Sequence, residues 1–261
     1  MKPLRAGDEL VDILDPYEQA DRSSPRGPCW VLANMVGGLD GSASVAGRAG
    51  GLSNATDAEL FRAIRALSDV VLVGAETVRQ ERYGPAKLTE QRRCARVAAG
   101  KPAVPRVAIV TRSLDLDWDA PIFTGSAPDS ATLVVTCEAA DPSRLQRARR
   151  SAEVVVAGDK AVEPGKALAA LAGLGARVVL CEGGPTLLGL LVADDLLDEL
   201  CFTLAPVMGG DPLPIAVSPP AASRPDPSPP GSAPGASLHR FALAHSLVED
   251  DMLFLRYLRR G

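Results

Sequence analysis

Histidine, paired cysteine and aromatic residues are scarce in this chain, and their scarcity excludes several kinds of site. Only 2 of the 261 residues are histidine, and aromatic residues make up 4% of the chain. The 5 cysteines stand singly, and no CxxC pair occurs. Zinc sites and disulfide frameworks need more of these residues at closer spacing. We therefore predict no metal site and no disulfide framework.

Long apolar runs and an excess of positive charge are also missing. No segment is apolar over the length that a membrane-spanning helix needs, and the first residues lack the apolar core of a secretion signal. The net charge of −4 gives no electrostatic reason to expect nucleic acid as a partner. The sequence therefore predicts a cytoplasmic protein that binds neither membranes nor nucleic acids.

Short β-branched apolar runs alternate with helical segments from residue 29 onward. The expected strands are Cys29–Val36, Asp69–Val73, Val107–Val110, Leu133–Thr136, Glu153–Val156 and Arg177–Cys181. The expected helices are Thr56–Leu67 with Thr56 as N-cap, Ala75–Glu81, Pro142–Ser151 and Pro164–Leu174. This alternation predicts an α/β fold with a mainly parallel, doubly wound sheet. Three later strands are expected without helices between them, which predicts an antiparallel C-terminal end of the sheet. They are Glu199–Ala205, Arg240–Leu247 and Met252–Tyr257.

Two segments differ from this alternation. Residues 1–28 hold several prolines and little periodicity, so we expect an N-terminal arm with one short helical turn at Val11–Leu14. Residues 212–237 are dominated by proline, alanine, serine and glycine, a composition that favours a long surface loop. The main domain is therefore expected to span residues 29–261, with 212–237 as an insertion that has no function of its own.

Glycine clusters follow three of the expected strands, at Gly37–Gly41, Gly74–Thr77 and Glu182–Thr186. In an open parallel sheet, ligands bind at the carboxyl ends of the strands. Glycine lets the backbone approach a ligand closely, and the amides of a following helix start can bind phosphate oxygens. The chain has neither a GxGxxG motif nor a P-loop, so the standard Rossmann and Walker sites are not expected.

Four motifs, in the same order, resemble the pyrimidine reductase domain of riboflavin biosynthesis. They are Ala33–Gly41 (ANMVGGLDG), Ser68–Val78 (SDVVLVGAETV), Val178–Leu187 (VVLCEGGPTL) and Leu197–Gly210, which begins with LDEL and ends with APVMGG. The resemblance covers about residues 29–211 and implies a dihydrofolate-reductase-like fold, a homodimer and hydride transfer from NADPH to a small-molecule substrate. Residues 29–261 would then be the reductase domain. The zinc deaminase signature of bifunctional members is absent.

The resemblance also implies where NADPH binds. The residues carried over to the cofactor are Ala33, Gly74, Thr77, Gly183, Gly184, Pro185, Thr186 and Leu187. The segment Thr111, Arg112 and Ser113 is similar to the family segment that meets the adenosine 2′-phosphate. Arg112 suits that role because a guanidinium offers paired donors to a phosphate, and the alternative is a solvated arginine at a strand end.

Asp40 and Glu182 are the candidate catalytic residues. Reduction of a C=N bond needs a hydride on carbon and a proton on nitrogen, which a carboxyl group can supply. Asp40 lies in a Leu-Asp-Gly turn, where aspartate can instead brace the backbone.

The expected substrate residues are Asn34, Ser53, Arg62 and Arg65. Arg62 and Arg65 lie one turn apart on the expected helix and suit a ribosyl phosphate, although Arg62 equally suits a solvated helix face. This chain departs from the family at Asn34, where a lysine is usual, at Gly38, where a serine is usual, and at Glu81–Leu88, which replaces an Asp-Pro-x-Leu segment. The cofactor half of the site is therefore better supported than the substrate half.

The predicted function is reduction, with NADPH, of a riboflavin-pathway ribosylaminopyrimidine of the 5-amino-6-ribosylaminouracil 5′-phosphate type or of a pterin-like substrate. Two alternatives remain open at this point. One is dihydrofolate reductase activity, which the shared fold allows. The other is an NADPH-binding protein without turnover. The sequence does not separate them, because one fold supports many reactions.

Overall fold

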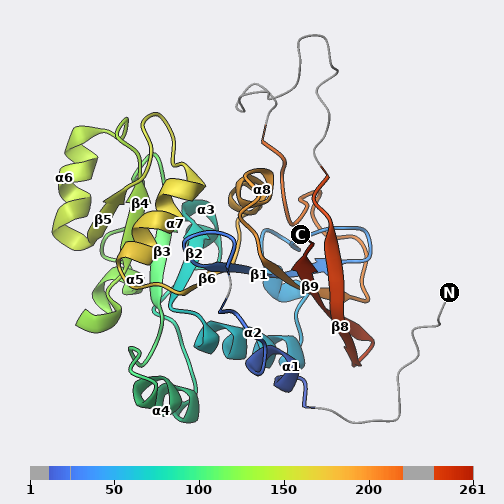
Figure 1. The fold of residues 1–261 in the computed structure, drawn as a ribbon. Helices are drawn as coiled ribbons and strands as arrows, with labels where there is room; N and C mark the ends of the chain where they lie inside the picture. Colours follow the sequence, from blue (N-terminus) through green and yellow to red (C-terminus); the bar gives the residue numbers. More distant parts are fainter. Residues whose placement is uncertain (1–11, 24, 220–237, 261) are drawn as a thin grey trace.

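One twisted sheet organises the protein, with helices packed on both of its faces (Figure 1). The computed structural model describes residues 12–23, 25–219 and 238–260. Within these residues the sheet has nine strands in the order β5-β4-β3-β2-β6-β1-β7-β9-β8. The strands from β5 to β7 in this order pair in parallel, and β9 and β8 add an antiparallel end. The predicted α/β fold is therefore confirmed.

The strands form where the β-branched apolar runs predicted them. Their bounds are β1 Trp30–Gly38, β2 Val70–Gly74, β3 Arg106–Val110, β4 Leu133–Thr136, β5 Glu153–Val156, β6 Val178–Cys181, β7 Glu199–Ala205, β8 Phe241–Glu249 and β9 Met252–Arg259. Differences from the predicted bounds are confined to a few residues at strand ends, because pairing with a neighbouring strand decides where each strand stops.

The helices follow the prediction less closely. Their bounds are α1 Asp15–Glu18, α2 Ala55–Leu67, α3 Ala75–Gln80, α4 Glu90–Ala98, α5 Pro121–Thr124, α6 Pro142–Ser151, α7 Pro164–Gly173 and α8 Pro185–Ala193, with 3-10 turns at Ala49–Gly51 and Pro128–Ser130. The prediction of Thr56 as N-cap was wrong, because the side chain of Asn54 accepts the amide of Asp57 instead. Of the helical turn predicted at Val11–Leu14, Val11 lies outside the described residues; the described helix, α1, begins after Leu14 and has Pro16 in its first turn.

The core has two halves, one on each face of the sheet. Along β2, Val71 and Val73 pack with Ile64 of α2, whereas Val70 and Leu72 pack with Leu168 of α7. Successive strand residues point to opposite faces, so a run of apolar residues without alternation fills both halves at once. Residues 212–219 have no helix or strand, and the rest of the predicted loop, 220–237, lies outside the described residues.

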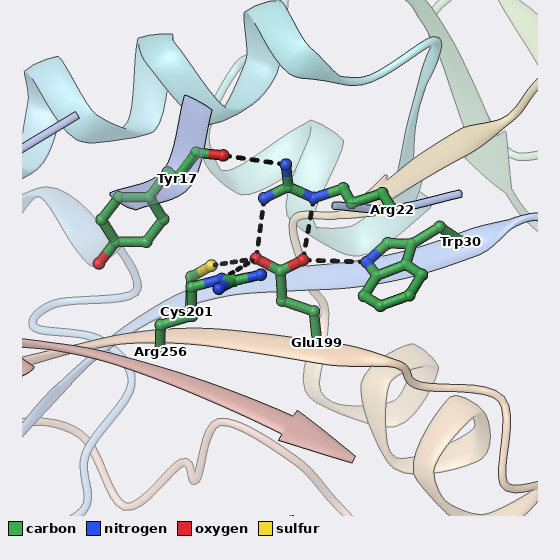
Figure 2. A network of polar contacts seen from close by, with 6 residues as sticks. All are labelled: Tyr17, Arg22, Trp30, Glu199, Cys201 and Arg256. Atoms are coloured by element: carbon green, nitrogen blue, oxygen red, sulfur yellow. Dashed lines mark hydrogen bonds and ion pairs between the residues drawn. The ribbon is translucent and has the colours of Figure 1, made fainter. Parts of the chain in front are cut away.

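A buried ion-pair network joins the N-terminal arm to the sheet (Figure 2). Glu199, the first residue of β7, is fully buried and accepts two hydrogen bonds from Arg22 at 2.9 Å each. It also accepts one from Arg256 Nε at 2.6 Å and one from Trp30 Nε1 at 2.9 Å. Arg22 donates further to the carbonyl of Tyr17 at 2.9 Å. The described part of the arm is thus anchored on the domain by charge-assisted bonds.

Arg22→Ala should lower the free energy of unfolding by about 2 kcal/mol at neutral pH, because Glu199 would lose two charge-assisted bonds while buried. Burial raises the pKa of Glu199, but the hydrogen bond from Arg256 and the charge of Arg22 bring this pKa below its ordinary value of 4.5. A lowered pKa stabilises the folded state above that pH, and the contribution is lost as the pH falls.

Urea unfolding of both proteins at several pH values measures this effect. The difference between Arg22→Ala and the unmodified protein should shrink as the pH is lowered below 4.5. Arg149→Ala, which removes an exposed arginine of α6, is the control and should change little. A stability difference that stays constant with pH would contradict the role of the Arg22–Glu199 pair.

Candidate functional site

A cavity of about 430 Å³ opens at the carboxyl-terminal parts of β1 and β6. Its walls come from β1, α2 and α3, from the turn between β6 and α8, and from the segments at residues 43–53, 81–87 and 213–215. The expected site residues that line it are Asn34, Ser53, Arg65, Thr77, Glu182, Gly183, Gly184 and Pro185. The cavity therefore brings together predicted cofactor residues and predicted substrate residues.

The turn between β6 and α8, residues 182–185, forms one wall of the cavity. Gly183 has a φ of +98°, a backbone conformation that glycine adopts far more readily than other residues. Its carbonyl accepts the amide of Gly74 at 3.0 Å, so the turn sits against the end of β2. A Cβ on Gly184 would lie 3.0 Å from Thr77 Oγ1. The glycines thus let three segments meet closely, beside the amides that begin α8.

Arg65, Glu182 and Tyr83 form a hydrogen-bonded cluster on the cavity wall. Arg65 donates Nε to Glu182 Oε1 and Nη2 to Glu182 Oε2, both at 2.6 Å, and the Tyr83 hydroxyl donates to Oε2 at 2.8 Å. The Arg65 guanidinium also lies 4.2 Å from the centre of the Phe61 ring. Burial alone would lower the pKa of Arg65. The negative charge of Glu182 and the hydrogen bonds to it together outweigh that effect, so the pKa of Arg65 is raised above its ordinary value. Both groups of this pair are fixed by paired, charge-assisted bonds.

Two buried oxygen acceptors face the same cavity. Asn34 is 9% exposed, and its Oδ1 has no hydrogen-bond partner among the described residues. Asp57 is 7% exposed, and its Oδ2 accepts the Ser53 hydroxyl at 2.5 Å. A buried acceptor without a donor is destabilising, so a ligand with N–H groups would complete this wall.

The sequence prediction missed Asp57, although a signal for it exists. Asp57, Phe61 and Arg65 are spaced four residues apart on α2, which places them along one face of the helix. All three line the cavity. An acidic residue in the first turn of a helix is usually explained by its favourable interaction with the helix dipole. That explanation gives no reason to expect that the side chain faces a cavity.

Asp40 lies outside the cavity lining and braces two loops. Its Oδ1 accepts the hydroxyl of Ser42 at 2.6 Å and the amide of Ser42 at 3.1 Å. Its Oδ2 accepts the amides of Gly209 at 2.6 Å and Gly210 at 3.3 Å. The hydroxyl bond from Ser42, followed by these amide bonds, holds the pKa of Asp40 well below its ordinary value. An ionised, loop-bracing carboxylate matches the alternative reading of this residue.

The remaining expected residues also lie outside the cavity lining. They are Ala33, Arg62, Gly74, Thr111, Arg112, Ser113, Thr186 and Leu187. Arg112 and Ser113 are exposed at the carboxyl end of β3, where Arg144 of α6 donates to the carbonyl of Ser113 at 3.0 Å. Thr111 is buried, and its hydroxyl accepts the amide of Leu114 at 3.1 Å. This segment therefore has an exposed end, Arg112 and Ser113, with Arg144 beside it.

Two further properties concern the described residues as a whole. No helix among them is long and apolar enough to cross a membrane. No three or more of their His, Cys, Asp and Glu side chains are grouped so as to hold a metal ion.

Comparison with known proteins decides the family. Residues 29–224 match the RibD C-terminal domain family. The chain belongs to this family. A 2,5-diamino-6-ribosylamino-4(3H)-pyrimidinone 5′-phosphate reductase from Methanothermobacter thermautotrophicus is 29% identical over 181 residues, which are 69% of this chain and 79% of the relative. The predicted resemblance to pyrimidine reductases, and with it the assignment as an oxidoreductase, is confirmed.

Solved structures of RibD-like proteins agree with this assignment. A pyrimidine reductase-like protein from Corynebacterium diphtheriae has a TM-score of 0.77 and 25% identity, over 89% of this chain and 92% of that one. RibD from Acinetobacter baumannii has a TM-score of 0.65 and 19% identity, over 89% of this chain and 58% of that one. The second likeness shows the shared fold.

Proposed function

We propose that this member of the RibD C-terminal domain family reduces a ribosylaminopyrimidine 5′-phosphate with NADPH. The observation that carries the proposal is that one cavity joins the glycine turn at residues 182–185 to a wall of buried acceptors. The first feature suits a dinucleotide and the second suits an amino-substituted heterocycle. A hydride donor and its acceptor must meet in such a shared space.

The glycine turn and the start of α8 fit the pyrophosphate of NADPH. The turn has no side chain at Gly183 and Gly184 to block a ligand. Pro185, the first residue of α8, has no N–H, so the amides of Thr186 and Leu187 are the first that the helix offers. We propose that Gly74 and Thr77 complete this side and that Arg112 binds the adenosine 2′-phosphate. NADPH, when bound, supplies the hydride.

The acceptor wall fits the heterocycle. The substrate named for the Methanothermobacter relative is a diaminopyrimidinone, whose amino groups are hydrogen-bond donors. We propose that Asn34 Oδ1 and the Asp57 carboxylate accept N–H groups of such a ring. Donors from the ligand would satisfy both buried acceptors, which favours an amino-bearing ring over an all-acceptor ring.

Glu182 is proposed to act as a positioning residue. Its carboxylate already accepts three hydrogen bonds, two from Arg65 and one from Tyr83. Paired, charge-assisted bonds of this kind fix the geometry of both partners. We propose that Glu182 fixes Arg65 and Tyr83 against the substrate.

Dihydrofolate is the second candidate substrate. A pterin ring carries an amino group that the same acceptors could bind, and Asn34 stands where the family usually has lysine. The loop at residues 81–88 also departs from the usual family segment. Dihydrofolate therefore belongs in every activity assay beside the pyrimidine, and binding of NADPH without turnover of either would favour a binding protein.

We further propose a cytoplasmic homodimer. β8 forms one edge of the described sheet, and its Leu243 and Val248 are 47% and 44% exposed. An edge strand with exposed apolar residues suits pairing with a second copy. Light scattering of the purified protein measures its mass directly.

Asp57→Asn should raise KM for the substrate roughly tenfold or more while the protein stays folded. The asparagine amide has no charge and replaces one acceptor oxygen by an N–H donor, so its bond to an N–H group of the substrate is weaker. Steady-state kinetics with saturating NADPH measures this change. Glu59→Gln is the matched control, since Glu59 is an exposed acid on the same helix. Equal KM values for Asp57→Asn and the unmodified protein would exclude Asp57 from the substrate site.

Arg112→Ala should weaken NADPH binding roughly tenfold and leave NADH binding nearly unchanged, because only NADPH carries the 2′-phosphate. Fluorescence titration with each cofactor measures both affinities. Arg147→Ala, an exposed arginine on α6, controls for the loss of one positive charge. Equal losses for the two cofactors would contradict the proposed role of Arg112.

A further inference from the structure

Three cationic side chains line the cavity, and they differ in what they bind. Arg65 has two of its donors committed to Glu182 at 2.6 Å. Arg82 and Lys87 also line the cavity, and both are exposed. Within residues 12–23, 25–219 and 238–260, neither of these two side chains has a hydrogen bond or ion pair. The cavity thus has two uncommitted positive charges on one loop.

The loop that carries Arg82 and Lys87 is fixed on both of its sides. Glu81 Oε1 accepts the amide of Ala49 at 2.8 Å, and the Tyr83 hydroxyl donates to Glu182 at 2.8 Å. Ala86 is 6% exposed and anchors the far end. The two cations therefore extend from a positioned backbone, which reduces the entropy lost when they bind a ligand.

The acids that line the cavity are already engaged. Asp57 accepts the Ser53 hydroxyl, Glu81 accepts the Ala49 amide, and Glu182 accepts Arg65 and Tyr83. None of them is paired with the two loop cations. A ligand that fills the cavity can therefore supply the missing negative charge.

We propose that Arg82 and Lys87 bind the anionic tail of the substrate, at the opposite end from the heterocycle. The inference rests on the proposed function of this cavity and names its anion subsite. The tail is a phosphate monoester in a ribosylaminopyrimidine 5′-phosphate and a pair of carboxylates in dihydrofolate. Arginine offers a fork of donors and lysine a compact charge, a combination that suits either anion. Arg62, which is exposed and outside the lining, is not part of the subsite.

Ligands with and without the tail test this inference. Calorimetry with saturating NADPH compares the ribosylaminopyrimidine 5′-phosphate with its dephosphorylated form, and dihydrofolate with dihydropterin. The variants are Arg82→Asn, Lys87→Gln and the double variant; asparagine is used because Arg82 has a φ of +51°, which asparagine tolerates. Lys160→Gln, an exposed lysine before α7, is the control.

The double variant should bind the tail-bearing ligand roughly 100-fold more weakly, about tenfold for each charge-assisted contact, and bind the tail-less ligand unchanged. The pair of ligands that shows the effect identifies the tail. An equal change for both members of each pair, or a loss in Arg62→Gln instead, would overturn the subsite.

Failure of the proposed function gives a different result. If the unmodified protein bound neither pair of ligands, the proposed reductase function would be wrong. The subsite would then be judged with inorganic pyrophosphate, which the unmodified protein should bind and the double variant should bind at least tenfold more weakly. Equal pyrophosphate binding by the two proteins would overturn the subsite itself.

Discussion

Glu182→Gln should lower turnover roughly 100-fold and the free energy of unfolding by about 3 kcal/mol. The rate falls because Arg65 and Tyr83 lose the group that orients them, and small displacements in an active site have effects of about this size. The stability falls because Arg65, whose side chain is 14% exposed, keeps its charge and loses the carboxylate that pairs with it. Breaking a buried pair costs about 3–5 kcal/mol. Glutamine also directs an amide N–H toward the guanidinium.

Turnover must be measured at a temperature where the variant is folded, so that a positioning role is separated from simple unfolding. The expected result is a fall in kcat with a smaller change in NADPH affinity. Glu153→Gln is the matched control: Glu153 pairs with Arg106 at 2.6 Å but lies on the exposed edge strand β5. That variant should change neither quantity much. Unchanged kcat in Glu182→Gln would remove Glu182 from the active site.

Gly183→Val should abolish measurable NADPH binding, with a loss of more than 100-fold. At a φ of +98°, a β-branched residue is strained, so the turn must move to accept it. The shift would displace the carbonyl that accepts the Gly74 amide and the amides that begin α8. The amides are proposed to bind the pyrophosphate, and the carbonyl holds the turn against the end of β2.

Calorimetric titration with NADPH measures the effect, and circular dichroism checks the fold. Gly165→Val is the control, because Gly165 lies in the first turn of α7 with open space where its Cβ would be. That variant should bind NADPH normally. Normal binding by Gly183→Val would show that this turn has a structural role only.

The sheet and the glycine turns could be predicted from the sequence because their signals are local. The β-branched runs of β2, β3 and β6 mark buried strands, and the glycines after β6 mark a tight turn. Helix α4 was not predicted. Its sequence, EQRRCARVA, has few apolar residues, so the helical periodicity that a core-facing side produces is weak.

The interactions that define the site depend on contacts between distant parts of the chain. Arg65 and Glu182 were both predicted as site residues, but in separate roles, and their pairing spans 117 residues. The bond between Arg22 and Glu199 spans 177 residues and joins the arm to β7. No local pattern encodes such pairs, because the packing of the whole sheet decides which buried charges meet.

The direct test of the central proposal follows NADPH oxidation by its absorbance, with 2,5-diamino-6-ribosylamino-4(3H)-pyrimidinone 5′-phosphate and with dihydrofolate, each compared with NADH. The account predicts oxidation of NADPH that depends on the pyrimidine, is much slower with NADH, and is lost in Gly183→Val. NADPH that binds but is oxidised with neither substrate would contradict the proposed reductase function.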